Sequence, residues 1–345
     1  MNTLPEKEFK NPRAKHNFVG RTCSITGVGS YVPEKILTNA DLEKMVDTTD
    51  EWITSRTGIK ERHIAAKDEF TSDLAAKAAQ RAMERAGVTA GQIDLIIVAT
   101  ITPDMPFPST ACLVQKKLGA KRAAAFDLEA ACSGFIYGLE IGQQFIMSRT
   151  YDTVLVIAAE KLSSIVDWED RNTCILFGDG AGAAILQNRP NSHGLLTVVM
   201  GADGEKANLL LMPGGGSQCP ATAESVASRQ HFLRMEGKET FKHAVQAMQT
   251  AAQEVLRRCE ISVEQLKCII PHQANRRIID AVADRLNAKP EQLFVNVDKY
   301  GNTSAASVAI ALDEAASSGK IRQGDLIMLV VFGAGLTWGA AVIEW

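Results

Sequence analysis

Three residues, Cys132, His272 and Asn302, have side chains and positions suited to acyl-transfer chemistry. Cys132 lies where an apolar run that starts at Ala123 and predicts a buried strand gives way to helical spacing. A thiol at a helix start lies near the positive end of the helix dipole and free N–H groups, and both favour the thiolate that attacks thioesters. The neighbouring residues are small, so a substrate can reach the sulfur. We therefore interpret Cys132 as a nucleophile, although a cysteine taken alone is more often structural.

His272 and Asn302 are the candidate partners of this thiol. His272 lies just past the predicted strand at 268–271, and doubly wound folds place functional groups at strand ends. Asn302 precedes a predicted helix, where it could equally serve as a cap. A lone histidine is also more often structural than catalytic. Taken together, however, the three residues supply a nucleophile and two donors or proton carriers, and no acidic residue takes an obvious third place of a hydrolase triad.

The elements that would position these residues occur twice along the chain. The first series is helix 71–87, strand 95–100, helix 111–119, strand 123–128 and the helix opened by Cys132. The second is helix 241–259, strand 268–270, helix 278–287, strand 293–297 and the helix opened near Asn302. The repeat predicts two pseudo-symmetric halves whose apolar strands are covered on both faces. Stacked through their inner helices, these halves form a five-layered αβαβα α/β fold, with a flexible extension at 1–20, one half at 21–190 and the other at 191–345.

Composition limits the other possibilities. The 345 residues are 46% hydrophobic and 22% charged with a net charge of −3, which gives no global basic field for nucleic acid. No apolar run is long enough to span a membrane. The seven cysteines are odd in number and lack metal-like spacing, which favours reduced thiols, a cytoplasmic location and no metal site. The glycine-rich segments 178–182 and 212–217 lack nucleotide-binding spacing and predict turns, whereas Gly333 to Gly335 could expose N–H groups to an oxyanion.

Four motifs, at 129–134, 271–275, 300–307 and 332–339, resemble those of β-ketoacyl-[acyl-carrier-protein] synthase III, a condensing enzyme of the thiolase fold. The similarity runs from about Cys23 to Trp345. Chain-elongating ketosynthases carry two histidines, whereas Asn302 stands at the second position here. Plant-type polyketide synthases share the Cys-His-Asn set, but the segment 50–63 looks like the bacterial enzyme.

The resemblance implies an acyltransferase that initiates type II fatty acid synthesis. It would condense a short acyl-CoA, acetyl-CoA by expectation, with malonyl-acyl-carrier-protein, giving 3-ketoacyl-carrier-protein, coenzyme A and CO2. Cys132 would take the acyl group while its own N–H and that of Ala334 hold the oxyanion. His272 and Asn302 would bind the malonyl thioester oxygen as CO2 leaves, and Phe332 would help to exclude water. Coenzyme A enters as a substrate thioester, and no cofactor is expected.

The resemblance also implies binding roles for residues outside the catalytic set. Trp52 and Arg171 would sandwich the adenine of coenzyme A, with Arg56 and Asn275 also near the nucleotide. Phe107 would cross a homodimer interface to close the partner's acyl pocket. The wall of the acyl pocket would be formed by Leu162, Phe177 and Leu233. The docking patch for the carrier protein would be formed by Lys242, Arg276 and Arg277, and Asp284 stands where the family typically has a lysine of this patch.

Two other functions compete with this interpretation. One is a thiolase-fold acyltransferase of secondary metabolism that uses a different acyl primer, which stays open because primer choice depends on pocket volume. The other is a non-catalytic paralogue that only binds acyl chains or partners. Such a paralogue would be expected to lack Cys132, His272 or Asn302, and all three are present.

Overall fold

A computed structural model describes residues 22–189 and 194–345 of the chain. The predicted extension at 1–20 and the predicted boundary between the halves at 190/191 lie outside the described residues, so both stay predictions.

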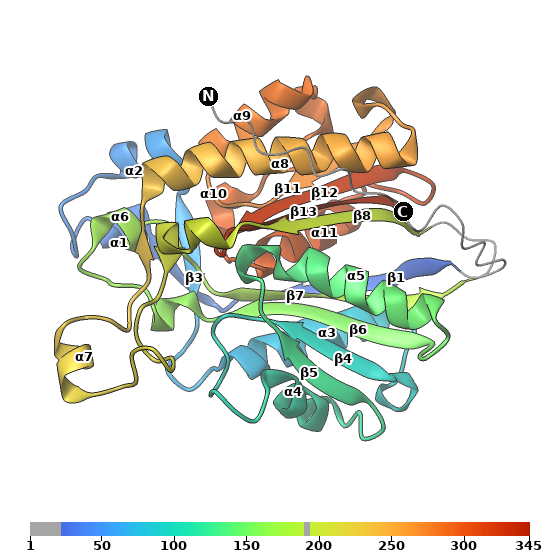
Figure 1. The fold of residues 1–345 in the computed structure, drawn as a ribbon, viewed down its shortest axis with the longest axis horizontal. Helices are drawn as coiled ribbons and strands as arrows, with labels where there is room; N and C mark the ends of the chain where they lie inside the picture. The colour runs from blue at the N-terminus through green and yellow to red at the C-terminus, as the bar shows by residue number, and fades with distance from the viewer. Residues whose placement is uncertain (1–21, 190–193) are drawn as a thin grey trace.

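Two sheets form the framework of the molecule (Figure 1). In the first sheet β4 lies between β5 and β6 and runs parallel to both, while β7 and β1 complete the sheet with antiparallel pairings. In the second sheet β11 pairs parallel with β12, and β13 and β8 follow antiparallel. The strands are β1 Cys23–Tyr31, β4 Leu95–Ala99, β5 Ala124–Leu128, β6 Thr153–Glu160, β7 Gly180–Asn188, β8 Leu195–Ala202, β11 Cys268–Pro271, β12 Leu326–Gly333 and β13 Thr337–Glu344.

Helices cover both faces of each sheet, which confirms the predicted five-layered α/β fold. Two helices cover the outer face of the first sheet, two lie between the sheets, and two cover the outer side of the second sheet (Figure 1). Three apolar clusters fill the interfaces between these layers, the largest around the inner pair. From one outer side to the other the helices are α3 Thr71–Ala86 and α4 Thr110–Leu118, then α5 Gly134–Met147 and α11 Ala306–Ser317, then α8 Gly237–Cys259 and α9 Arg276–Leu286.

Glycines let the inner helix α5 lie directly on the first sheet. They recur every fourth residue, at Gly134, Gly138 and Gly142, and so face one side of the helix. A Cβ atom at Gly138 would lie 2.7 Å from a Val156 methyl carbon on β6. The helix that follows Cys132 is thereby held close to the strands that build the site.

One predicted strand is wrong. Residues 293–297 form a single bridge, between Leu293 and Ile269, and the helix α10 begins at Val297. The side chain of Gln273 replaces a partner strand: its amide oxygen accepts from the N–H of Asn296 at 2.9 Å, and its amide group donates to the carbonyl of Phe294 at 3.3 Å. A side-chain amide used in this way satisfies the backbone without a strand ladder.

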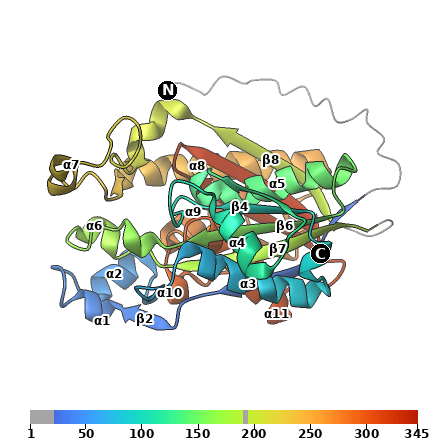
Figure 2. The same ribbon diagram turned by 90° about the horizontal axis from the view of Figure 1, so that it is seen from below.

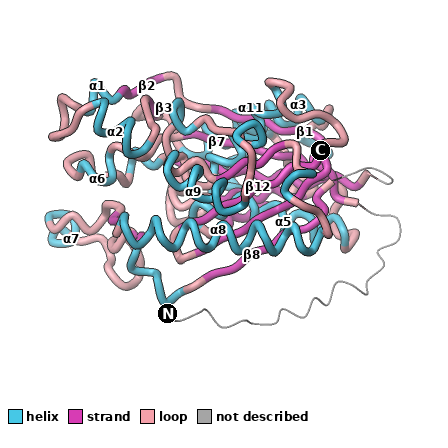
Figure 3. The backbone as a smooth tube through the Cα atoms, turned by 90° about the horizontal axis from the view of Figure 1, so that it is seen from above, coloured by secondary structure: helices cyan, strands magenta, loops and turns pink. Residues whose placement is uncertain are grey.

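The shorter elements gather at one end of the molecule, where Figures 2 and 3 show α1, α2, α6 and α7 together. A fully buried arginine, Arg62, ties this end together by donating to Asn39 Oδ1 at 2.9 Å and to the carbonyl of Ile175 at 2.6 Å. No helix in the described ranges is long and apolar enough to cross a membrane. The short elements are β2 Lys35–Thr38, α1 Asn39–Leu42, α2 Asp50–Thr57, β3 Glu61–Ile64, α6 Arg171–Cys174, β9 Leu210–Leu211, α7 Ala223–Ala227, β10 Arg234–Met235 and α10 Val297–Tyr300.

Candidate active site

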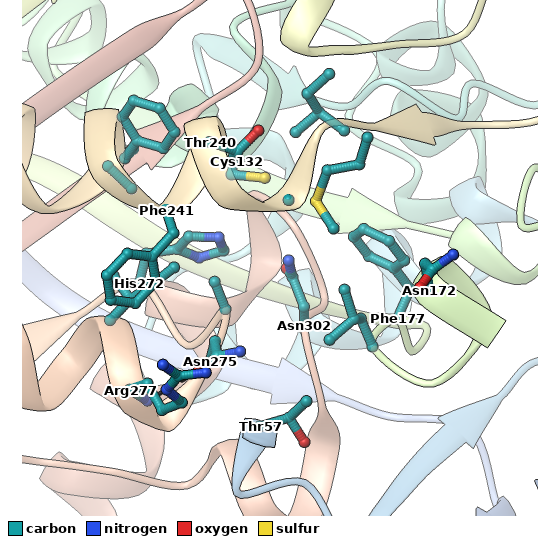
Figure 4. Close-up of a pocket in the computed structure, with 18 of the residues that line it drawn as sticks. Thr57, Cys132, Asn172, Phe177, Thr240, Phe241, His272, Asn275, Arg277 and Asn302 are labelled. Carbon is teal, nitrogen blue, oxygen red and sulfur yellow. Dashed lines mark hydrogen bonds between the residues drawn. The ribbon is translucent and has the colours of Figure 1, made fainter. Parts of the chain in front are cut away.

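Cys132, His272 and Asn302 line one pocket of about 620 Å³ (Figure 4). The three come from different parts of the fold: the turn after β5, the end of β11, and the loop before α11. Each is buried, with 4 to 7% of its surface exposed. The predicted convergence of these side chains is therefore present in the structure, although their roles stay predictions.

The turn that carries Cys132 is tighter than predicted. Cys132 lies in a 3-10 turn, Ala131–Ser133, and α5 itself begins at Gly134. The preceding residue, Ala131, has a φ of 44°, a left-handed conformation that non-glycine residues rarely adopt and that is often found at functional sites. This turn carries the thiol from the end of the strand into the pocket.

The pKa of Cys132 moves in the opposite direction to our expectation. Burial raises the pKa of the Cys132 thiol to about 12, and the negative charge of Glu160 adds to the rise. The polar Ser304 side chain and the cysteine's own N–H favour the thiolate and oppose this rise in pKa without cancelling it. The free pocket therefore favours the neutral thiol, and forming the thiolate requires a group that takes its proton.

His272 is held neutral and in a fixed orientation. Its backbone N–H donates to the carbonyl of Val330 at 2.8 Å, and its Nδ1 lies 2.6 Å from the hydroxyl oxygen of Ser307. Burial lowers the pKa of His272 to about 4. At neutral pH the imidazole is uncharged, and the contact at Nδ1 leaves Nε2 as the ring nitrogen available to a ligand.

Asn302 is oriented by its own loop. Its backbone N–H donates to the carbonyl of Leu176 at 2.8 Å, and its side-chain oxygen accepts from the N–H of Ser304 at 2.8 Å. Because the oxygen is occupied, the amide nitrogen is the group that Asn302 can present to a ligand. His272 and Asn302 can thus act as neutral hydrogen-bond partners on the same side of the pocket.

The end of β12 packs against the backbone of Cys132. A Cβ atom at Gly333 would lie 2.7 Å from the backbone nitrogen of Cys132, so only glycine fits there. The Thr337 hydroxyl ties the following turn to the cysteine loop, since it lies 2.9 Å from the carbonyl oxygen of Ala130 and 3.0 Å from that of Ala334. Phe332 and Gly333 line the pocket, whereas Ala334 is not among its lining residues. The predicted oxyanion role of the Ala334 N–H stays a prediction.

Trp52 and Arg171, the pair predicted to sandwich adenine, lie too close together in the structure to admit a base between them. The Arg171 guanidinium lies 5.4 Å from the centre of the Trp52 ring, and that of Arg56 lies 4.9 Å from it. A base stacked between two flat groups requires those groups to be about 7 Å apart, because each of the two stacking contacts takes about 3.5 Å. An adenine would therefore have to displace Arg171, which is exposed and donates to the backbone carbonyl of Asp47.

Asn275, Arg276 and Arg277 lie at the start of α9, whereas Lys242 lies near the start of α8. Asn275 lines the pocket but also caps this helix, since its side-chain oxygen accepts from the N–H of Arg277 at 2.8 Å. The Arg277 guanidinium lies 5.7 Å from the ring centre of Phe241, and Arg277 lines the pocket. Arg276 pairs with Asp280 at 2.7 Å, and Lys242 is exposed; neither lines the pocket.

Of the four predicted acyl-pocket residues, only Phe177 lines this pocket. Leu162 and Leu233 are buried in the adjoining apolar cluster that also contains Phe177. Phe107 is 84% exposed in the loop before α4, so it makes no wall of its own chain's pocket.

Sequence reasoning missed most of the apolar wall. It comes from one face of α8, at Thr240, Ala244 and Met248, and from the short strands that contain Leu210 and Met235. The four-residue spacing along α8 indicates that these residues share one face of the helix. The sequence predicts only that such an outer helix packs on the second sheet, because the spacing does not show that its N-terminal half also borders a cavity. No group of three metal-ligating side chains occurs among the residues that the structure describes.

Comparison with known proteins identifies the family. Family models described as 3-oxoacyl-[acyl-carrier-protein] synthase III and its C-terminal part match residues 126–204 and 256–345. β-Ketoacyl-[acyl-carrier-protein] synthase III of Caldanaerobacter subterraneus subsp. tengcongensis is 58% identical over 321 residues, 93% of this chain and 97% of that protein. The chain belongs to the β-ketoacyl-[acyl-carrier-protein] synthase III family. It is an acyltransferase, an initiating condensing enzyme of type II fatty acid synthesis.

Similar solved structures have the same fold. The crystal structure of 3-oxoacyl-[acyl-carrier-protein] synthase III from Aquifex aeolicus VF5 is 50% identical, with a TM-score of 0.88 over 94% of this chain and all of that one. The priming β-ketosynthase from the R1128 polyketide biosynthetic pathway is 38% identical, with a TM-score of 0.87 over 94% of this chain and 96% of that one. The thiolase-like fold is therefore confirmed.

Proposed function

We propose that this chain condenses a short acyl-CoA, acetyl-CoA by preference, with malonyl-acyl-carrier-protein. The observation that carries the proposal is the meeting of Cys132, His272 and Asn302 in one pocket. The same pocket is lined by Trp52 and Arg56, an aromatic ring and a cation suited to a nucleotide thioester.

The first half-reaction transfers the acyl group to Cys132. The thiolate attacks the thioester carbonyl, the carbonyl oxygen becomes an oxyanion, and the coenzyme A sulfur leaves as the carbonyl re-forms. We assign the backbone N–H groups of Cys132 and Ala334 to the oxyanion, since β12 brings its end directly against the cysteine backbone. Burial of the sulfur keeps water from the acyl-enzyme.

The second half-reaction decarboxylates the malonyl group. As CO2 leaves, negative charge develops on the malonyl thioester oxygen, and the resulting carbanion equivalent attacks the acyl carbon on Cys132. His272 and Asn302 would donate to that oxygen. A neutral imidazole and an oriented amide suit this step, because neither must change its charge to stabilise the developing enolate. Phe332 beside them would limit the access of water.

We further propose a cytoplasmic homodimer. The support is the exposed ring of Phe107, which suits an isologous interface better than solvent. The acidic carrier protein would dock near the start of α9, where Arg277 lies at the pocket.

The test is incubation with acetyl-CoA followed by intact-protein mass spectrometry. One acetyl adduct is expected in the wild type and none in Cys132→Ala. An adduct that persists in Cys132→Ala would overturn the assignment of the nucleophile. A panel of acyl-CoA primers with malonyl-carrier protein, with products identified by mass, distinguishes acetyl-CoA from the longer or branched primers expected of a secondary-metabolism enzyme.

A further inference from the structure

One arginine, Arg229, ties the segment around α7 to the turn that precedes α6. The α7 segment projects from the end of the molecule where α6 also lies (Figure 1). Arg229 binds Asp167 through two nitrogens: Nε donates to Oδ2 at 3.0 Å, and Nη2 donates to Oδ1. Its Nη1 lies 2.9 Å from Oε2 of Glu169. A planar guanidinium that binds one carboxylate twice fixes the orientation of its partner as well as the distance.

The backbone at Arg229 would suit a glycine better than an arginine. Its φ is 56°, in the left-handed region, just after the last turn of α7, where its N–H donates to the carbonyl of Val226 at 3.0 Å. Glycine is favoured at such a position because it has no Cβ. An arginine there costs free energy that its contacts with the Asp167 and Glu169 carboxylates must offset.

Asp167 begins the turn that leads into α6. Its Oδ1 also accepts from the N–H of Glu169 at 3.0 Å, and its carbonyl accepts from the N–H of Asp170 at 3.0 Å. Asp170 in turn caps α6 by accepting from the N–H of Asn172 at 3.0 Å. Both Asp170 and Asn172 line the candidate active-site pocket. A short series of hydrogen bonds therefore runs from Arg229 to the pocket wall.

Between these two wall residues stands Arg171, the predicted stacking partner of adenine. Its guanidinium lies 5.4 Å from the centre of the Trp52 ring, so an adenine must displace it. Arg171 is the first residue of α6, which has four residues. A helix this short has little stability of its own, so its place depends on the contacts that hold the preceding turn. The pair of Arg229 and Asp167 supplies such contacts.

We propose that Arg229 is a positioning residue for coenzyme A, because through Asp167 it holds the start of α6 where the Arg171 guanidinium can stack on a bound adenine. The inference rests on the proposed function, in which the acyl group arrives on coenzyme A. The malonyl group arrives instead on a carrier protein, whose thioester arm ends in no adenine. Loss of the pair should therefore weaken the binding of coenzyme A and spare the carrier substrate.

The test is the dissociation constant of coenzyme A, measured by isothermal titration calorimetry on the full-length enzyme. Arg229→Gly removes the side chain and suits the left-handed backbone, so the fold should persist. The dissociation constant should rise about fivefold, a modest effect because the Arg229 side chain is 42% exposed. Asp167→Asn should cause a similar loss. Arg229→Lys keeps the charge without the planar fork and should recover only part of the affinity.

Two controls identify the route of the effect. In an Arg171→Ala background, Arg229→Gly should cause no further loss, because the side chain that it positions is gone. Arg257→Ala removes a pair of the same geometry, with Glu254 at 2.8 and 2.9 Å, near the C-terminal end of α8, and should leave the affinity unchanged. The KM for malonyl-carrier protein should also stay the same in Arg229→Gly.

The outcomes separate this inference from the proposed function. Equal dissociation constants in the wild type, Arg229→Gly and Asp167→Asn would overturn the inference alone. An equal loss of affinity with and without Arg171 would also overturn it, because the pair would then act elsewhere. A wild-type enzyme that binds no coenzyme A would overturn the proposed function and this inference with it.

Discussion

The side-chain oxygen of Asn302 accepts a hydrogen bond from the backbone N–H of Ser304 at 2.8 Å, which leaves the amide nitrogen to face the pocket. In the proposed mechanism this amide nitrogen and the His272 ring donate during decarboxylation, whereas acyl transfer uses backbone N–H groups at Cys132.

Replacing Asn302 should therefore impair one half-reaction. Asn302→Ala should slow decarboxylation of malonyl-carrier protein about a hundredfold or more, because one oriented donor is lost, while acyl-enzyme still forms. Asn302→Asp should be as slow, since an oxygen would replace the donor. The measurement is CO2 release and acyl-enzyme formation in separate assays. Loss of acylation with normal decarboxylation would show that this division is wrong.

The pH dependence of decarboxylation should follow the neutral state of His272. Burial lowers the pKa of His272 to about 4, and a lowered pKa favours the uncharged imidazole. The imidazole thus stays neutral from pH 8 down to about pH 5 and gains its proton only near pH 4. Malonyl decarboxylation should show no inflection near pH 6.5, the ordinary histidine value. A titration with a midpoint near pH 6.5 that is absent in His272→Ala would contradict this.

Gly333→Ala should disturb the cysteine turn. The added methyl group would lie 2.7 Å from the Cys132 nitrogen and 3.1 Å from that of Ser133, so the backbone must shift. We expect a stability loss of about 1–3 kcal/mol and at least tenfold slower acetylation of Cys132. Thermal unfolding and intact-mass kinetics measure the two effects. Gly216→Ala is the control, because nothing lies within 4 Å of its added carbon. Equal behaviour of the two variants would refute the close-packing argument.

Charge reversal at the pocket entrance should weaken carrier binding. Arg277→Glu should raise the KM for malonyl-carrier protein about fivefold, equivalent to about 1 kcal/mol, and the wild-type KM should rise with salt. Arg257→Glu is the control: it lies on α8 but about 24 Å along the helix from Phe241, at 1.5 Å per residue. An unchanged KM in Arg277→Glu would remove this residue from the docking patch.

Phe107→Ala should weaken the proposed homodimer. An exposed aromatic anchor at an interface is typically worth about 2 kcal/mol or more, so the dissociation constant should rise about thirtyfold. Val226→Ala, which trims an exposed apolar residue on α7, should leave the association unchanged. Analytical ultracentrifugation gives both constants. A fully active wild-type monomer would rule out an obligate dimer.

The sequence by itself determined the residues that meet in the pocket and the class of fold. Cys132, His272 and Asn302 each stand at the end of a strongly patterned element, and local apolar periodicity places such ends reliably. The same local reasoning failed at residues 293–297, where the side chain of Gln273, about twenty residues away, occupies the backbone groups that a strand would use.

Only the tertiary structure decided the environment of the thiol. Local sequence predicts an acidic cysteine from the helix start, but burial and the charge of Glu160 raise its pKa. Glu160 and Ser304 are 144 residues apart, and nothing in the pattern around either one indicates the other. They meet because α11 packs against the first sheet and carries its preceding loop to the end of β6. The desolvation that shifts a pKa depends on all the atoms that surround the group. Around Cys132 those atoms come together only when the two halves of the chain pack against each other.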